Sequence, residues 1–122
     1  MQQNYSLDHF LPWRFVAHDL LWNLVPVPQN VNSAKGDSLP DLTTYFDPFA
    51  RLQYEAFQAV SAGGTSRQAK LLEDYVLLFG ASSISEVQSL PLKTFRQVLY
   101  DILAPQFQIA RNMGFVTGWK YN

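Results

Sequence analysis

Apolar residues recur at helical spacing along most of the chain, and this pattern predicts an all-α protein. From Pro12 to about Leu24, most apolar residues fall on one helical face, while Phe15 and Trp22 fall on the opposite face. A helix on the rim of a monomer needs only one apolar face. The second face therefore indicates either a central helix or a contact outside the domain.

Start and stop signals predict two further helices in the middle of the chain. Asp47 before Pro48 is typical of a helix start, and this helix is expected to run to about Ala62, where two glycines end it. A second helix is predicted over 66–79, with Gly80 as its C-cap. The short link makes the two helices an antiparallel hairpin.

The C-terminal half predicts a short helix followed by a long one. Ser83 and Glu86 have the spacing of a capping box, which predicts a short helix to about Ser89. A long helix is predicted from Pro91, and its apolar phase continues through Pro105. We therefore expect a kinked continuous helix or two nearly collinear helices there. The central hairpin and this helix are expected to form the core.

Two segments lack a helical pattern. Residues 26–46 are predicted as one long loop, and residues 115–122 as an extended aromatic tail. Loops of this length are often functional or wrapped on a partner, although an ordered surface excursion is the alternative. Strands are compatible only with 24–31 or with the tail. We therefore expect a single domain over 1–122, a bundle of four to five helices.

The composition indicates that part of the surface is covered by a partner. Hydrophobic residues make up 48% of the 122 residues and aromatic residues 15%, whereas charged residues make up only 16%. Aromatic side chains anchor interfaces, although a well-packed aromatic core with an amide-rich surface is the alternative. Cysteine is absent, which excludes disulfides and thiolate sites. A net charge of -1 argues against dominant nucleic-acid or anionic-membrane binding.

No recognisable catalytic constellation stands out in the sequence. His9 and His18 lack a second ligand at helical i+3 or i+4 spacing, and Asp8 beside His9 would diverge from it on a helix. The adjacent carboxylates Glu73 and Asp74 diverge in the same way. The sequence also lacks a nucleophile elbow. We therefore expect no enzyme, no catalytic residue, no metal site and no cofactor.

Two segments have features that can meet phosphate. The glycine-rich turn over 63–67 precedes a helix, but it lacks the lysine and the preceding strand of a P-loop. The segment 77–91 resembles in rhythm the lead into a helix-hairpin-helix DNA-binding element. That resemblance implies phosphate contacts through backbone amides, with Lys93, Arg96 and Arg111 nearby. The hairpin position has no glycine, and a proline there removes one amide.

The sequence favours a non-catalytic function: a structural or adaptor subunit of a larger protein assembly, such as a virus-particle connector or a small subunit of a multiprotein machine. Docking would use apolar residues of the second helical faces and of the tail. These candidate partner-binding residues are Phe15, Trp22, Leu77, Phe115, Trp119 and Tyr121. The alternative for the tail is that it folds back over its own bundle.

Two other functions stay open at this point. One is a helical module that binds a small apolar ligand in a pocket lined by Phe and Tyr. The other is a DNA-binding accessory domain that acts through the segment 77–91.

The expected partners are other protein subunits, further copies of this chain included, and nucleic acid is not expected. No apolar run is long enough to insert into a membrane, and the polar N-terminus lacks a signal-peptide pattern. We therefore expect a soluble protein of the cytoplasm or of a virus particle.

Overall fold

The chain divides into two compact units. The computed structural model describes residues 4–16, 21–63, 65–66, 70 and 72–121. Unit 1 comprises Met1–Phe46 with Pro105–Asn122, and unit 2 comprises Asp47–Ala104. Helices α3 (Leu42–Gly63) and α7 (Leu92–Asn112) each contribute residues to both units. The expected single domain over 1–122 stays a prediction.

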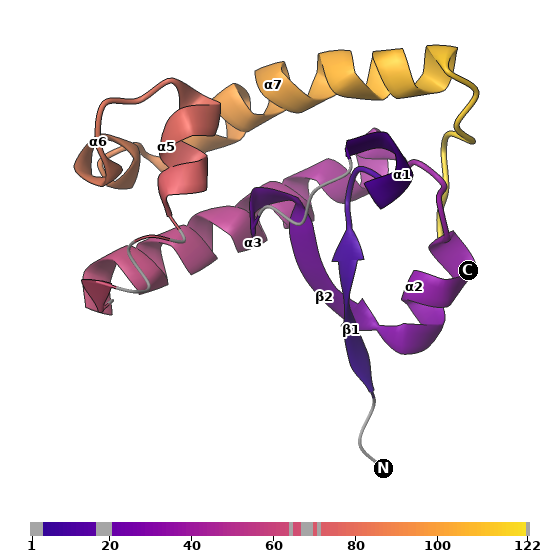
Figure 1. The fold of residues 1–122 in the computed structure, drawn as a ribbon, viewed down its shortest axis with the longest axis horizontal. Coiled ribbons are helices and arrows are strands. Elements are labelled where there is room, and N and C mark those ends of the chain that lie inside the picture. The colour runs from indigo at the N-terminus through magenta and orange to yellow at the C-terminus, as the bar shows by residue number, and fades with distance from the viewer. Residues whose placement is uncertain (1–3, 17–20, 64, 67–69, 71, 122) are drawn as a thin grey trace. The chain divides into compact units, whose positions relative to one another are not determined.

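Unit 1 contains a two-stranded antiparallel hairpin (Figure 1). Strand β1 (Tyr5–His9) pairs with β2 (Leu24–Pro28), and the register places Asp8 opposite Val25 and His9 opposite Leu24. The prolines of β2 lack an N–H, which a two-stranded sheet tolerates because each strand has a free edge. The predicted all-α fold is therefore wrong, since the mostly helical chain also carries this small sheet.

The predicted helix from Pro12 to Leu24 is also wrong. Its place is taken by the short helix α1 (Trp13–Val16), the 3-10 turn η1 (Leu21–Asn23) and the start of β2. Residues 17–20, and with them His18, lie outside the described residues. The apolar stripe that suggested one helix instead supplies separate short elements, and Trp22 in η1 is buried.

The predicted loop over 26–46 contains regular structure. It holds most of β2, the helix α2 (Gln29–Lys35) and the first residues of α3. Gly36 ends α2 in the left-handed region with φ of 52°. Helix α3 begins before the expected Asp47, because Asp41 accepts hydrogen bonds from the Thr44 N–H and hydroxyl at 3.0 and 2.6 Å.

The C-terminal tail is held by residues of its own unit. The Leu39 N–H donates to the Val116 carbonyl at 2.7 Å, and the Trp119 N–H donates to the Leu39 carbonyl at 3.0 Å. An isolated parallel bridge joins Pro40 to Trp119, whose ring stacks on Tyr45 with centroids 5.8 Å apart. These contacts agree with the alternative that the sequence left open, in which the tail folds back over its own chain.

Unit 2 has a core of interlocking aromatic rings from three helices. Besides α3 and α7, it contains α5 (Glu73–Phe79) and the short helix α6 (Ile84–Gln88). The fully buried ring of Phe95 contacts Phe57, Tyr75 and Phe79 at centroid distances of 6.3, 6.4 and 4.8 Å. Much of the aromatic content thus packs inside the chain.

Several helix signals in the C-terminal half of the chain are confirmed. Gly80 caps α5 in the left-handed conformation, with φ of 64°. Ser83 accepts the Glu86 N–H at the start of α6. Helix α7 runs continuously through Pro105, as one of the two expected forms. In the described part of the chain, no helix is both long and apolar enough to cross a membrane.

Candidate functional site

A group of buried polar side chains surrounds the hairpin and α2 of unit 1. Asp8, Asn23 and Lys35 expose only 6%, 0% and 3% of their surface. Charged residues are rarely buried to this extent unless they are paired, and buried amides need hydrogen-bond partners. Each of the three meets this requirement through a contact with a residue far away in the sequence.

Asp8 and Lys35 form a buried ion pair between β1 and α2. The Lys35 Nζ lies 3.3 Å from Asp8 Oδ1 and donates a hydrogen bond to the His9 carbonyl oxygen at 2.6 Å. The two residues are 27 positions apart, and the tertiary fold alone brings them together. Lys35 is the last residue of α2, so its ammonium ties the end of that helix to the end of β1.

Burial governs the protonation of this pair. Desolvation raises the pKa of Asp8, although the positive charge of Lys35 and its hydrogen bond act in the opposite direction. Desolvation also lowers the pKa of Lys35, against the opposing effect of the Asp8 carboxylate. Loss of water therefore outweighs the attraction within the pair, which is the usual situation for buried ions.

Asn23 fixes the chain that follows β1. Its side-chain Oδ1 accepts the Leu11 N–H at 2.7 Å, and its Nδ2 donates to the Leu11 carbonyl at 2.9 Å. Its own backbone carbonyl accepts the Phe10 N–H at 2.9 Å. These hydrogen bonds pin residues 10–11 to η1, and so they restrain the end of β1 where His9 lies.

Ser6 and Asn32 extend the polar group along the same face. Side chains two apart on a strand share a face, so Ser6 lies on the side of β1 that carries Asp8. Asn32 lies one helical turn before Lys35, and its Nδ2 donates to the Ser6 hydroxyl at 3.1 Å. The half-buried His9 belongs to the opposite face of β1, at the strand end. His9 and Asp8 therefore lie on opposite faces of β1 at its C-terminal end.

The oxygen atoms of this group have the chemistry of ligands for a hard divalent cation. The carboxylate of Asp8, the amide oxygen of Asn32 and the hydroxyl of Ser6 are all oxygen donors, which Mg²⁺ prefers. Among the described residues, no three His, Cys, Asp or Glu side chains gather as metal ligands. The donors fit an ion that keeps several waters and uses one or two protein carboxylates, provided that Lys35 leaves Asp8.

Five of the six residues predicted to bind a partner lie in unit 1. Phe15 and Phe115 meet edge to face at 5.9 Å, and Trp22 is buried. Trp119 contacts Tyr45, while the hydroxyl of the exposed Tyr121 accepts a hydrogen bond from Asn30. Leu77 lies in unit 2 and is 81% exposed. The structure thus engages most of these side chains within the chain, and their docking role stays a prediction.

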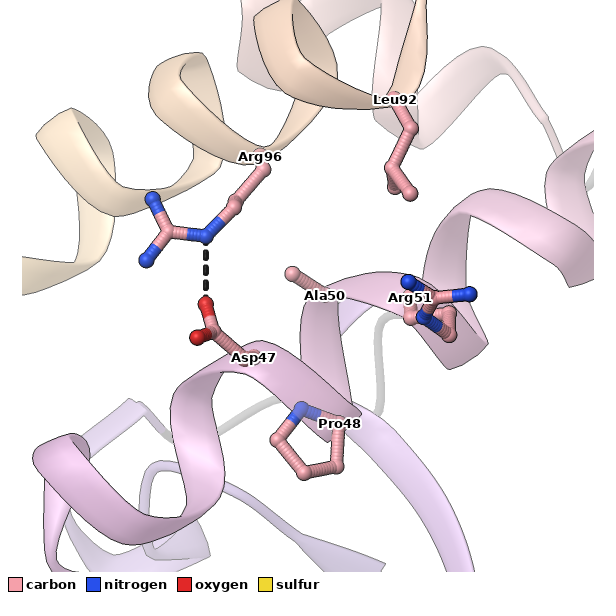
Figure 2. Close-up of a pocket in the computed structure, with 6 residues that line it drawn as sticks. All are labelled: Asp47, Pro48, Ala50, Arg51, Leu92 and Arg96. Carbon is pink, nitrogen blue, oxygen red and sulfur yellow. Dashed lines mark hydrogen bonds and ion pairs between the residues drawn. The ribbon is translucent and has the colours of Figure 1, made fainter.

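A hollow of about 470 Å³ in unit 2 has no aromatic lining (Figure 2). Figure 2 shows Arg96 of α7 pointing toward Asp47 of α3, and these two side chains form an ion pair. The remaining lining residues are Pro48, Ala50, Arg51 and Leu92. This open, charged hollow lacks the Phe and Tyr lining that a small apolar ligand was expected to use.

The sequence did not indicate the polar group around β1, β2 and α2, because its residues were predicted to lie on other elements. Asp8 and His9 were treated as helical neighbours, and Asn32 and Lys35 were placed in a loop. The residues that could have indicated a site are the Asp8-His9 dipeptide and the asparagines and Lys35 that follow it in the same segment. Without the strand pairing, nothing in their spacing indicated a common face.

Comparison with known proteins adds one finding for this region. Residues 1–41 match a family model described as HNH endonuclease, which covers 41 of the 122 residues, or about a third of the chain. The searches of curated proteins and of solved structures returned no significant match. The matched segment contains β1, α1, η1, β2 and α2, and therefore the whole polar group described above.

This match corrects the functional predictions. The expectation of a non-catalytic structural or virus-particle adaptor is wrong, as are the expectations of no enzyme and of no nucleic acid. The net charge of the chain was a poor guide to nucleic-acid binding, because net charge describes long-range attraction and not the chemistry of a local site. The residues of the polar group were also judged by helical spacing, whereas Asp8 and His9 lie on β1 and Lys35 lies on α2. The N-terminal third of the chain is similar to an HNH endonuclease.

Proposed function

We propose that unit 1 carries a nuclease site, built on β1, β2 and α2, that hydrolyses phosphodiester bonds in nucleic acid. The observation that carries this proposal is the match of residues 1–41 to the HNH endonuclease model. That match spans β1, which holds Asp8, and α2, which holds Asn32 and Lys35. A buried polar group in so small a unit costs stability, and a catalytic role accounts for its presence.

His9 is the candidate general base. It is the only histidine among the described residues, and imidazole is the side chain whose ordinary pKa lies near neutral pH. A base at that position would take a proton from an attacking water. The backbone on its C-terminal side is held by Asn23, so the imidazole starts from a restrained position. Restraint of this kind favours a productive geometry.

Asp8 and Asn32 are the candidate ligands of a divalent cation. Such a cation, when bound, neutralises charge on the phosphate oxygens and on the leaving group. Asp8 would supply a negative charge, Asn32 an amide oxygen, and Ser6 would orient the Asn32 amide through the hydrogen bond at 3.1 Å. The buried position of Asp8 limits competition from water.

The substrate class follows from the same similarity. An acidic net charge is compatible with nuclease chemistry when the phosphate is met through a bound cation rather than through a basic surface. Residues 1–41 contain only Arg14 and Lys35 as basic residues, which fits contact by a few local groups. Action on nucleic acid is consistent with a location inside a cell or a virus particle, and that location is part of this proposal.

The test is cleavage of supercoiled plasmid DNA and of single-stranded DNA and RNA by the purified chain with Mg²⁺. His9→Ala is expected to lower the rate by about 10²-fold or more, because a general base contributes that much. His18→Ala removes the other imidazole of the matched segment and serves as the control, with the rate expected to stay within about threefold. Thermal unfolding of both variants checks that each is folded. No cleavage by the parent chain, or full cleavage by His9→Ala, would contradict the proposal.

A further inference from the structure

Lys35 stands in an unusual position for a lysine. It is 3% exposed, and its ammonium contacts two oxygens, Asp8 Oδ1 at 3.3 Å and the His9 carbonyl at 2.6 Å. Lysine normally keeps its strongly hydrated ammonium in water, and its stem alone is buried. Here the charge itself is placed among the oxygen donors of the hairpin and α2.

The position of the Lys35 ammonium matters because a divalent cation would use the same group of oxygen atoms as ligands. Asp8 is the only acidic residue that is buried among the described residues, and its negative charge needs a compensating positive charge. Lys35 supplies that charge within the chain. A divalent cation at Asp8 and an ammonium at 3.3 Å from the same carboxylate would repel each other, and burial strengthens that repulsion.

We propose that Lys35 is a resident counter-ion that occupies the cation site of unit 1 and is displaced from Asp8 when a divalent cation binds. This inference rests on the cation-binding part of the proposed function.

The side chain and the local backbone suit such an exchange. Lys35 is the last residue of α2, and Gly36 follows it, so the ammonium sits at the end of a seven-residue helix and not in its middle. Its flexible four-carbon stem allows the charge to swing from a buried to a hydrated position. Without a cation, Lys35 holds α2 against β1, and the site stays folded and neutral overall.

The experiment measures Mg²⁺ affinity of the full chain by isothermal titration calorimetry for the parent and three variants. Lys35→Met keeps the apolar stem and removes the competing charge, so it is expected to bind Mg²⁺ at least tenfold more tightly. Lys35→Arg keeps the charge and is expected to stay within about threefold of the parent. Lys120→Met removes an exposed lysine of the same unit and controls for the change in net charge.

Two results would overturn the role of Lys35. One is an unchanged or weaker Mg²⁺ affinity in Lys35→Met. The other is an equal gain in Lys120→Met, which would show a general effect of net charge.

Thermal unfolding covers the case in which Lys35→Met is unfolded without a cation. The proposal predicts that its melting temperature rises steeply with Mg²⁺ concentration, because a ligand of the folded state stabilises by mass action. A variant that stays unfolded at every Mg²⁺ concentration would overturn the proposal. Tighter Mg²⁺ binding by Lys35→Met, together with no cleavage by the parent chain, would retain the counter-ion role and contradict the nuclease function.

Discussion

Asn23 provides a sensitive test of how the site is held together. Its side chain satisfies both the N–H and the carbonyl of Leu11, at 2.7 and 2.9 Å. Asn23 and Leu11 are both 0% exposed, so water cannot replace the amide. Asn23→Ala therefore leaves two backbone groups of Leu11 buried without partners.

The expected loss follows from the cost of such groups. An unsatisfied buried donor or acceptor costs about 1–3 kcal/mol, so the free energy of unfolding is expected to fall by about 2–5 kcal/mol. This is a large share of the roughly 5–15 kcal/mol typical of a whole domain. The melting temperature is expected to fall by about 10 °C for a chain of this length.

Urea denaturation followed by circular dichroism and tryptophan fluorescence measures the change. Asn112→Ala is the matched control, because Asn112 is exposed and its side chain accepts an exposed hydrogen bond from Gln108. It is expected to change the free energy of unfolding by no more than about 0.5 kcal/mol. A loss below about 0.5 kcal/mol for Asn23→Ala would refute the role assigned to the two hydrogen bonds.

Asn23→Asp adds a pH-dependent version of the same test. The carboxylate still accepts the Leu11 N–H, but it has no hydrogen to donate to the Leu11 carbonyl. Its protonated form can donate, so the pKa of the new carboxyl is expected to be raised in the folded state. The stability deficit relative to the parent should therefore shrink as pH falls through that raised pKa, and it should be smallest below about pH 4. A deficit that does not depend on pH would contradict this explanation.

The remaining predictions concern the ion pair and the core of unit 2. Lys35→Met alone is expected to lower the free energy of unfolding by about 3–5 kcal/mol in metal-free buffer, because it leaves the buried Asp8 charge without a partner. The double variant Asp8→Leu with Lys35→Met is expected to have a free energy of unfolding equal to or above that of the parent, because it removes both charges. Urea denaturation of both single variants and the double variant measures this, and equal losses in all three would contradict it. Phe95→Ala is expected to cost about 3–5 kcal/mol because its ring is fully buried among aromatic neighbours. The exposed Leu77→Ala is its control in the same assay, and similar losses for the two would count against the aromatic core.

Local signals in the sequence predicted local structure in the C-terminal half of the chain. Gly80, Ser83 and the apolar phase through Pro105 each act over one or two helical turns, so neighbouring residues suffice to specify them. Helix α3 shows the limit of such signals. Asp47-Pro48 suggested its start, but Asp41 makes the capping contacts with Thr44 and begins the helix earlier.

The elements of unit 1 could not be predicted from such local signals. Val25 and Val27 of β2 alternate with prolines over five residues, which is too short a pattern to outweigh the helical stripe before it. The strand exists because β1, from the other end of the segment, pairs with it. The aromatic tail shows the same dependence, since Trp119 is ordered by Leu39, Asp41 and Tyr45.

By itself, the sequence determined the cap of α5 at Gly80, the start of α6, the continuity of α7 and, in residues 1–41, the similarity to an HNH endonuclease. It did not determine where α3 and α5 begin, since α3 begins at Leu42 and α5 at Glu73. Only the tertiary structure decided that Asp8 and Lys35, 27 residues apart, form a buried ion pair, and that Asn23 holds the backbone beside His9. The physical reason is range. Helix caps and periodicity act between near neighbours, whereas strand pairing and burial of charge depend on residues that only the folded chain brings together.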